Sequence, residues 1–188
     1  WLAAGTRADP LHRIWNLAAP AGSHEDLMVD RPSTVAFYPL THHPVKKTPL
    51  PPFLMTGNEV AYRMWTIDPA TMKWKQLGHD HLSKMANSWG RTAQMVFSPR
   101  GTVVAVTYDR RYLQVLNPVT MEVMTQPGFD EQWPLAISPN GQWMATEGPR
   151  GHLFIWDLAE VRSGLQSLDW PPNVLPPFKP DPTPIVRP

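Results

Sequence analysis

The feature that most constrains the fold is a segment that occurs twice, with the same order of apolar strand, turn and aromatic-rich strand. The first copy covers residues 93–118 and the second covers residues 133–158. In each copy the first apolar stretch ends in Ser-Pro-x-Gly, which predicts a tight turn with a positive φ angle at the glycine. The two Ser-Pro pairs lie 40 residues apart, at Ser98-Pro99 and Ser138-Pro139. The chain therefore contains a repeat of about 40 residues built from several short strands.

Two further units match the same pattern. One begins near Val35, and the start of the chain supplies only the second and third strands of a still earlier unit. Repeats of this length with several short strands are typical of β-propellers, whose blades are four-stranded antiparallel sheets. We therefore predict an all-β fold of about three and a half propeller blades in an incomplete ring, because closure needs at least about four blades. The residues expected to share one third-strand position are Trp15, Trp65, Leu116 and Trp156.

The repeat predicts a propeller segment over residues 1–158. Its expected divisions are a partial blade and three blades, at residues 1–22, about 23–78, 79–126 and 127–158. More polar fourth strands are expected at about residues 25–29, 72–77 and 121–126. Two polar insertions interrupt the repeat, at residues 40–52 and 78–92, and loops of this kind carry binding residues in many proteins.

A different pattern follows the last repeat. Residues 159–170 predict a short helix and cap, because Val161, Leu165 and Leu168 recur at helical spacing. Residues 171–188 are rich in proline, which predicts an extended tail that cannot join the centre of a sheet. We expect the helix and tail to lie over the last blade and to bury Leu165 and Trp170.

Composition excludes several classes of protein. The 17 basic and 16 acidic residues nearly cancel, so no basic surface indicates binding to nucleic acid. The chain has no cysteine, which excludes disulfides and thiolate metal sites. Its longest apolar runs have the length of strands, so we expect no insertion into a membrane. It begins at Trp1 inside a strand-like segment, and we expect it to be part of a longer polypeptide.

Several of these segments resemble the WD-repeat β-propeller family. The similar segments are FSPRG, ISPNG and FIWDL, together with the dipeptide Gly78-His79, whereas Leu116-Asn117 replaces Trp-Asp in one unit. The ending WDLAEVRSGLQSLDWPP is similar to the C-terminal boundary of WD-repeat regions in large bacterial proteins, notably planctomycete-type proteins with a kinase or cytochrome region upstream. The resemblance implies that the chain is the C-terminal WD-repeat region of a larger protein.

The resemblance also implies a structural role for some polar residues. In the family a His, a Ser or Thr, an Asp and the third-strand Trp form a hydrogen-bonded set within a blade. His79 matches the histidine, Trp156-Asp157 matches the Trp-Asp dipeptide, and Thr107 and Thr146 lie in second strands. No unit holds the whole set, so we expect hydrophobic packing to contribute more of the rigidity.

Histidines are the only candidates for chemistry. The pair His42-His43 lies in the first insertion, and His79-Asp80-His81 opens the second. His79 and His81 could converge on a divalent metal, because alternate residues of a strand share a face. Since His79 is better explained as a structural residue, we expect no metal, no cofactor and no catalytic residue.

Aromatic residues outside the repeat position could anchor a protein partner. We expect Trp133 and Trp143 to be buried between blades instead. The segment around Phe178 could dock a polyproline-reading domain, although the tail could also lie along its own propeller. The expected partner-binding residues are Trp89, His42, His43, Trp170 and Phe178.

The function expected from these observations is that of a non-enzymatic WD-repeat scaffold or sensor module in protein–protein interaction. A protein partner, or the remainder of the parent chain, would complete the ring, and the isolated chain should self-associate through its exposed sheet edges. One alternative is an accessory C-terminal domain of a bacterial enzyme, such as a kinase or a c-type cytochrome, whose catalytic part lies upstream. A second alternative is a propeller hydrolase or metal enzyme that uses the loop histidines.

Overall fold

A computed structural model of the chain describes nine segments of it. They are residues 1–5, 10–20, 22–29, 33–39, 49–58, 61–82, 94–108, 112–128 and 131–167. The expected insertions lie mostly outside these segments, and so does the proline-rich tail.

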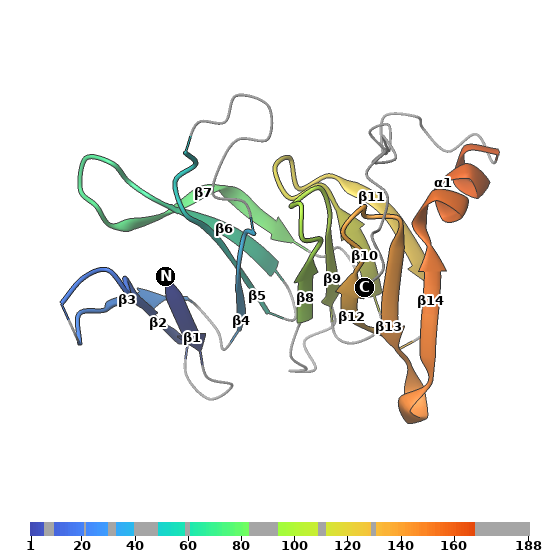
Figure 1. The fold of residues 1–188 in the computed structure, drawn as a ribbon, viewed down its shortest axis with the longest axis horizontal. Helices are drawn as coiled ribbons and strands as arrows, with labels where there is room; N and C mark the ends of the chain where they lie inside the picture. The colour runs from blue at the N-terminus through green and yellow to red at the C-terminus, as the bar shows by residue number, and fades with distance from the viewer. Residues whose placement is uncertain are drawn as a thin grey trace, which may run out of the picture.

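In the described segments, fourteen strands form four antiparallel sheets that follow one another along the chain and stand side by side in space (Figure 1). We call the sheets blades 1 to 4. Blade 1 contains β1 (Leu2–Gly5), β2 (Leu11–Trp15) and β3 (Glu25–Met28), and blade 2 contains β4 (Thr34–Phe37), β5 (Phe53–Gly57), β6 (Ala61–Ile67) and β7 (Trp74–Leu82). Blade 3 contains β8 (Gln94–Phe97), β9 (Val104–Tyr108), β10 (Tyr112–Leu116) and β11 (Val123–Gly128), and blade 4 contains β12 (Trp133–Ile137), β13 (Trp143–Glu147) and β14 (Leu153–Asp157).

The predicted fold class is confirmed: the chain is all-β, and its sheets are successive blades of an incomplete propeller. A 3-10 turn (Pro149–Gly151) joins β13 to β14, and a short helix, α1 (Leu158–Ser167), follows β14. Leu158 is buried among residues of blades 3 and 4 and so attaches the start of α1 to the stack. No helix in the described residues is long and apolar enough to cross a bilayer.

Strand pairing places the four expected third-strand residues at one structural position. In blades 2, 3 and 4 the last residue of the first strand pairs with a second-strand residue, which in turn pairs with Trp65, Leu116 or Trp156. In blade 1, Trp15 pairs with Leu2 in the same way, although that sheet has no described strand beyond β1. The register therefore defines equivalent positions in all four blades, and in blades 3 and 4 they lie 40 residues apart.

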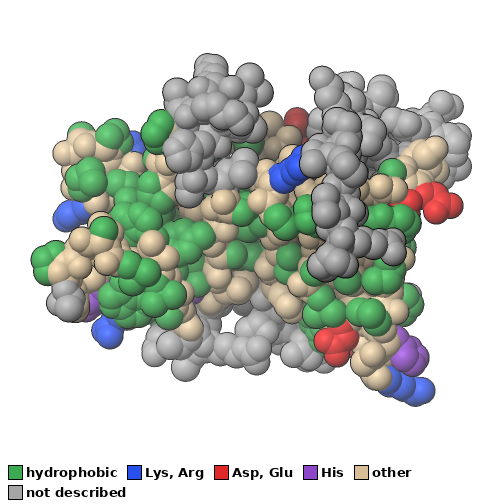
Figure 2. All heavy atoms as spheres, in the orientation of Figure 1, with side chains coloured by type: hydrophobic (Ala, Val, Ile, Leu, Met, Phe, Trp, Pro, Cys, Tyr) green, Lys and Arg blue, Asp and Glu red, His purple; other side chains and the backbone are tan. Residues whose placement is uncertain are grey.

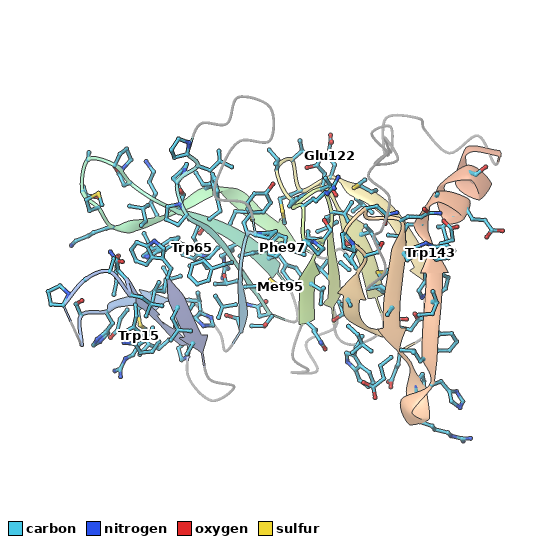
Figure 3. The ribbon with its side chains drawn as sticks, viewed as in Figure 1. Trp15, Trp65, Met95, Phe97, Glu122 and Trp143 are labelled. Carbon is cyan, nitrogen blue, oxygen red and sulfur yellow. The ribbon has the colours of Figure 1, made fainter. Side chains whose placement is uncertain are left out.

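Each pair of neighbouring blades is held together by its own apolar cluster. The cluster between blades 1 and 2 includes Ile14 and Trp65, and the cluster between blades 2 and 3 includes Met55 and Val104. Blades 3 and 4 share a third cluster, which includes Met144. Figure 3 shows Met95 and Phe97 between the second and third sheets. Because blades 2 and 3 are covered on both faces, their central strands carry buried apolar side chains on both sides, as in other sheets buried on both faces.

The two Ser-Pro-x-Gly segments form the tight turns that link first and second strands. Ser98 Oγ accepts hydrogen bonds from the backbone N–H groups of Thr102 and Val103, at 3.0 and 3.1 Å. Ser138 Oγ accepts one from the N–H of Trp143 at 2.8 Å. Gly101 and Gly141 have φ angles of 62° and 75°, in the left-handed region that the sequence predicts.

Three boundaries differ from those expected. The strand at residues 25–28 pairs with β2 as an outer strand, as expected, but blade 1 therefore extends beyond the boundary expected at residue 22. Residues 78–82, expected to open the second insertion, instead extend β7, which pairs with β6 as far as Ala61. A bulge makes this extension possible, because Gly78 adopts a φ angle of 65° where the register shifts. The outer strand β11 runs over residues 123–128, two residues later than expected.

Gly101 links backbone conformation to packing between blades, and this generates a prediction. A Cβ atom added at Gly101 would lie 2.5 Å from the ring of Tyr38, whose hydroxyl donates a hydrogen bond to Gly101 O at 3.0 Å. Gly101→Ala should therefore lower the free energy of unfolding by about 2–5 kcal/mol, through left-handed strain and displacement of Tyr38. Chemical denaturation followed by tryptophan fluorescence measures this change.

Gly78→Ala is the matched control, because Gly78 has nearly the same φ angle and no atom within 4 Å of the added Cβ. It should cost only the backbone strain, about 1–2 kcal/mol. Equal losses in the two variants would show that the contact of Tyr38 with Gly101 does not hold blades 2 and 3 together.

Candidate functional site

The face of blade 4 that is turned away from blade 3 is apolar and exposed. Side chains alternate along its strands, so Met144 and Trp156 face blade 3 while their neighbours face the other way. On that outer side Trp143 is 44% exposed, Leu153 is 63% exposed and Ile155 is 60% exposed. We call this surface the distal face, and Figure 3 shows Trp143 at that end of the row of sheets.

The equivalent residues of blade 3 are buried. Val103, Leu113 and Val115 lie 40 residues before Trp143, Leu153 and Ile155 and are 1%, 1% and 2% exposed. They are buried because blade 4 packs on them. The distal face therefore has the chemistry of a face between two blades, although no sheet covers it in the described structure.

The expectation that Trp143 is buried between blades is wrong in this structure. The repeat places it correctly on a face that receives the next blade, but blade 4 is the last sheet described. Trp133, for which the same was expected, is half-buried.

Blade 1 has a complementary open face at the other end of the row. Leu2 is 53% exposed, whereas its equivalents Leu54, Val104 and Met144 are fully buried. Trp15 lies beside Leu2 and is half-buried. We call this surface, which also includes Ala4 and Met28, the proximal face. Figure 2 shows hydrophobic side chains at both ends of the molecule.

Two of the polar contacts between blades are made by a tyrosine or histidine whose ring lies over a glycine of the paired strand. Tyr62, three residues before Trp65, covers Gly57, and its hydroxyl donates to Thr107 O at 2.7 Å and to Gln94 O at 3.1 Å in blade 3. His12, three residues before Trp15, covers Gly5 in the same way, and its Nε2 shares a hydrogen bond with Ser33, which precedes β4 of blade 2.

Burial sets the charge of His12. Its side chain is fully buried, and this desolvation lowers the pKa of the imidazole, so His12 is neutral at neutral pH. Glu25 adds a further link between the same blades, because its Oε1 accepts a hydrogen bond from the backbone N–H of Trp74 at 3.0 Å. The interfaces between blades 1 and 2 and between blades 2 and 3 are thus fixed by directional bonds as well as by apolar contact.

Blade 4 contains a buried polar set built around the repeat tryptophan. Trp156 Nε1 donates to Gln132 Oε1 at 3.0 Å and to Thr146 Oγ1 at 3.1 Å, and Thr146 Oγ1 donates to Gln132 Oε1 at 2.8 Å. Gln132 was not among the residues that the sequence analysis selected. Its only signal is a polar residue directly before the first strand of a unit.

The same position differs from blade to blade. In blade 2, Trp65 Nε1 donates to Thr56 Oγ1 at 2.9 Å. In blade 3 the equivalents of Thr146 and Trp156 are Val106 and Leu116, so both polar partners are replaced by apolar residues. Thr107, which the sequence analysis noted in this strand, lies one residue later and bonds to the backbone of Gln94 instead.

Asp157 begins the helix that follows the repeat. Its Oδ1 accepts hydrogen bonds from the backbone N–H groups of Ala159 and Glu160, at 2.9 and 3.2 Å, and so caps α1. In the other blades, a polar residue follows the third strand, and its side-chain oxygen accepts a hydrogen bond from the backbone N–H group two residues further on. The sequence analysis did not predict these turns, which are formed by Asn16, Asp68 and Asn117. A hydrogen bond from the backbone N–H of Ala70 holds the pKa of the Asp68 carboxyl below its usual value, and a hydrogen bond from the Lys75 side chain adds to this effect.

None of the predicted partner-binding residues lies in the described segments. Only the backbone of His79 is described, within β7, and no group of three or more metal-ligating side chains occurs in the described residues. The remaining expected residues lie outside the described segments: His42, His43, Trp89, Trp170 and Phe178. The same holds for Leu168 and for the side chain of Leu165.

No model of a protein family matches the chain, and no curated protein matches it.

The buried polar set of blade 4 generates a prediction. Gln132→Ala removes the acceptor that Trp156 and Thr146 share, so it should lower the free energy of unfolding by about 1–3 kcal/mol. Thermal and chemical denaturation measure this change. Gln142→Ala is the control, because Gln142 is a half-buried glutamine of the same blade whose side-chain amide makes longer bonds: its Nε2 donates to Asp157 at 3.3 Å, and its Oε1 accepts from Asn140 Nδ2 at 3.5 Å. A loss as large in the control would contradict a special role for Gln132.

Burial of His12 generates a second prediction, on pH. The pKa of His12 is lower in the folded chain than in the unfolded chain, where it is about 6.5. In this pH range the unfolded chain therefore binds a proton at His12 more readily than the folded chain does. The free energy of unfolding should fall as the pH is lowered from about 7.5 to about 5.5. Melting temperatures across this range measure the effect.

His12→Gln should flatten this pH dependence, whatever it does to the stability at pH 7.5. His24→Gln, which removes an exposed histidine of the same blade, should leave the dependence in place. An unchanged slope in the His12 variant would show that another group causes the loss.

Proposed function

We propose that the chain is a non-enzymatic interaction module that acts as a scaffold within a larger protein or complex. The observation that carries this proposal is the distal face. Its residues repeat the chemistry of buried faces in the same chain, yet they are exposed. An apolar sheet face of this kind is typical of a surface that another protein segment covers.

The directional polar groups of the described residues support the same proposal. The side chains of Tyr62, His12, Gln132 and Asp157 are all engaged in bonds between blades, within a blade or at a helix start. These roles hold a rigid platform in place. Reactive chemistry would instead need convergent polar groups around an accessible cavity.

We further propose that the module is a WD-repeat propeller segment. The proposal rests on the resemblance of the Ser-Pro-x-Gly and Trp-Asp segments, and on the bond between the third-strand tryptophan and a second-strand threonine in blades 2 and 4. In blade 4 Gln132 is the third member of this bonded set, whereas the set of the family contains a histidine.

Site-specific photo-crosslinking tests the proposed function. A photoreactive amino acid in place of Ile155 should crosslink to a defined protein segment in cells that make the full polypeptide, because that position faces the partner. The control is the same amino acid at Val119, which is also exposed but lies at the turn between β10 and β11. Equal, diffuse crosslinking at both positions would count against a scaffold role for the distal face.

A further inference from the structure

We infer that the distal face of one copy of this chain binds the proximal face of a second copy, so that two copies close a single ring. The inference rests on the proposed scaffold function and specifies its partner. It joins two surfaces that lie at opposite ends of the same row of sheets (Figure 1).

The two faces are complementary because the chain already contains the contact three times. In each interface between blades, the distal side of one sheet packs on the proximal side of the next sheet. The distal side bears the equivalents of Leu153 and Ile155, and the proximal side bears the equivalents of Leu2 and Trp15. Between blades 3 and 4, for example, Leu113 and Val115 share a cluster with Met144 and Trp156. The two free faces are the unused halves of that same contact.

The exposed residues suit this contact in size and polarity. Leu153 and Ile155 occupy the positions of Leu113 and Val115, so a following blade would meet leucine and a β-branched residue again. On the proximal face, Leu2 and Trp15 reproduce the pair formed by Leu54 and Trp65 in blade 2. Arg13 and Asp26 neutralise each other on that face, with Arg13 Nε and Asp26 Oδ1 3.2 Å apart.

The number of blades favours a closed pair of copies. The described residues of each copy form four sheets, so two copies bring together eight, which lies within the range of about four to eight blades of known propellers. A contact between two different faces forms a ring when its rotation closes. Two copies related by a two-fold axis would make the contact twice and leave neither apolar face exposed.

The first test is sedimentation of the purified 188-residue chain over a range of concentrations. We expect a species of two copies. Leu153→Asp on the distal face and Leu2→Asp on the proximal face should each raise the dissociation constant by about 100-fold or more. Ile155→Asp provides a second distal variant, and Val119→Asp introduces the same charge away from both faces and should leave the dimer intact.

Mixing the variants makes the test specific. A copy with Leu153→Asp and a copy with Leu2→Asp retain one unaltered pair of faces between them, so their mixture should associate more tightly than either variant alone. Circular dichroism confirms that each variant is folded, which is expected because the substituted side chains are exposed.

The inference would be overturned by a monomer at all concentrations, by a dimer that neither face variant weakens, or by variants whose mixture associates no better than each alone. Chains that lengthen with concentration would also overturn it, because they exclude ring closure. If the chain is monomeric and position 155 crosslinks to a different protein, the inference is wrong and the proposed scaffold function stands. If position 155 crosslinks to nothing defined, the proposed function itself fails.

Discussion

Face-to-face packing of apolar sheets is the interaction on which the rest of this structure depends. From Val103 to Val106, four consecutive residues of blade 3 are buried, two against each neighbouring blade. A strand of this kind cannot present a polar side to water, so each interior sheet requires a neighbour on both faces. The turns, the outer strands and α1 are arranged around this requirement, and only the two outermost faces leave it unmet.

The polar groups of the interfaces specify how the sheets stack. Apolar contact alone would tolerate sliding of one sheet over the next, since the hydrophobic effect has no direction. Tyr62 and His12 remove that freedom by reaching from a third strand to the backbone or side chain of the following unit. Each needs a glycine beneath its ring, so Gly57 and Gly5 belong to the same device as the rings they support. Tyr38 and Gly101 act similarly at the first turn of blade 3.

The repeat predicted the fold because turn chemistry and strand pattern are local properties. The Ser-Pro-x-Gly turns, the four third-strand positions and the short helix all follow from residues near one another in the sequence. The exposure of Trp143 did not follow, because burial at that position depends on whether another sheet is present. Gln132 was missed because its role depends on Trp156, 24 residues away, and on a threonine between them. The extension of β7 was missed because Gly78 was interpreted as the start of a loop, whereas its conformation permits a bulge within a strand.

The apolar pair Val106 and Leu116 has a consequence for how such blades diverge. Where the tryptophan is present, its buried N–H requires an acceptor, and the threonine supplies one. In blade 2, replacing Thr56 alone would leave the N–H of Trp65 without its acceptor, whereas in blade 4 Gln132 would remain as an acceptor for Trp156. Restoring a tryptophan beside Val106 would create an unpaired N–H while overfilling the site. The two positions are therefore epistatic in a blade that has no further acceptor such as Gln132. During evolution, substitutions at these two positions should therefore occur in pairs. The order within a pair should be the one that does not leave a buried polar group without a hydrogen-bond partner.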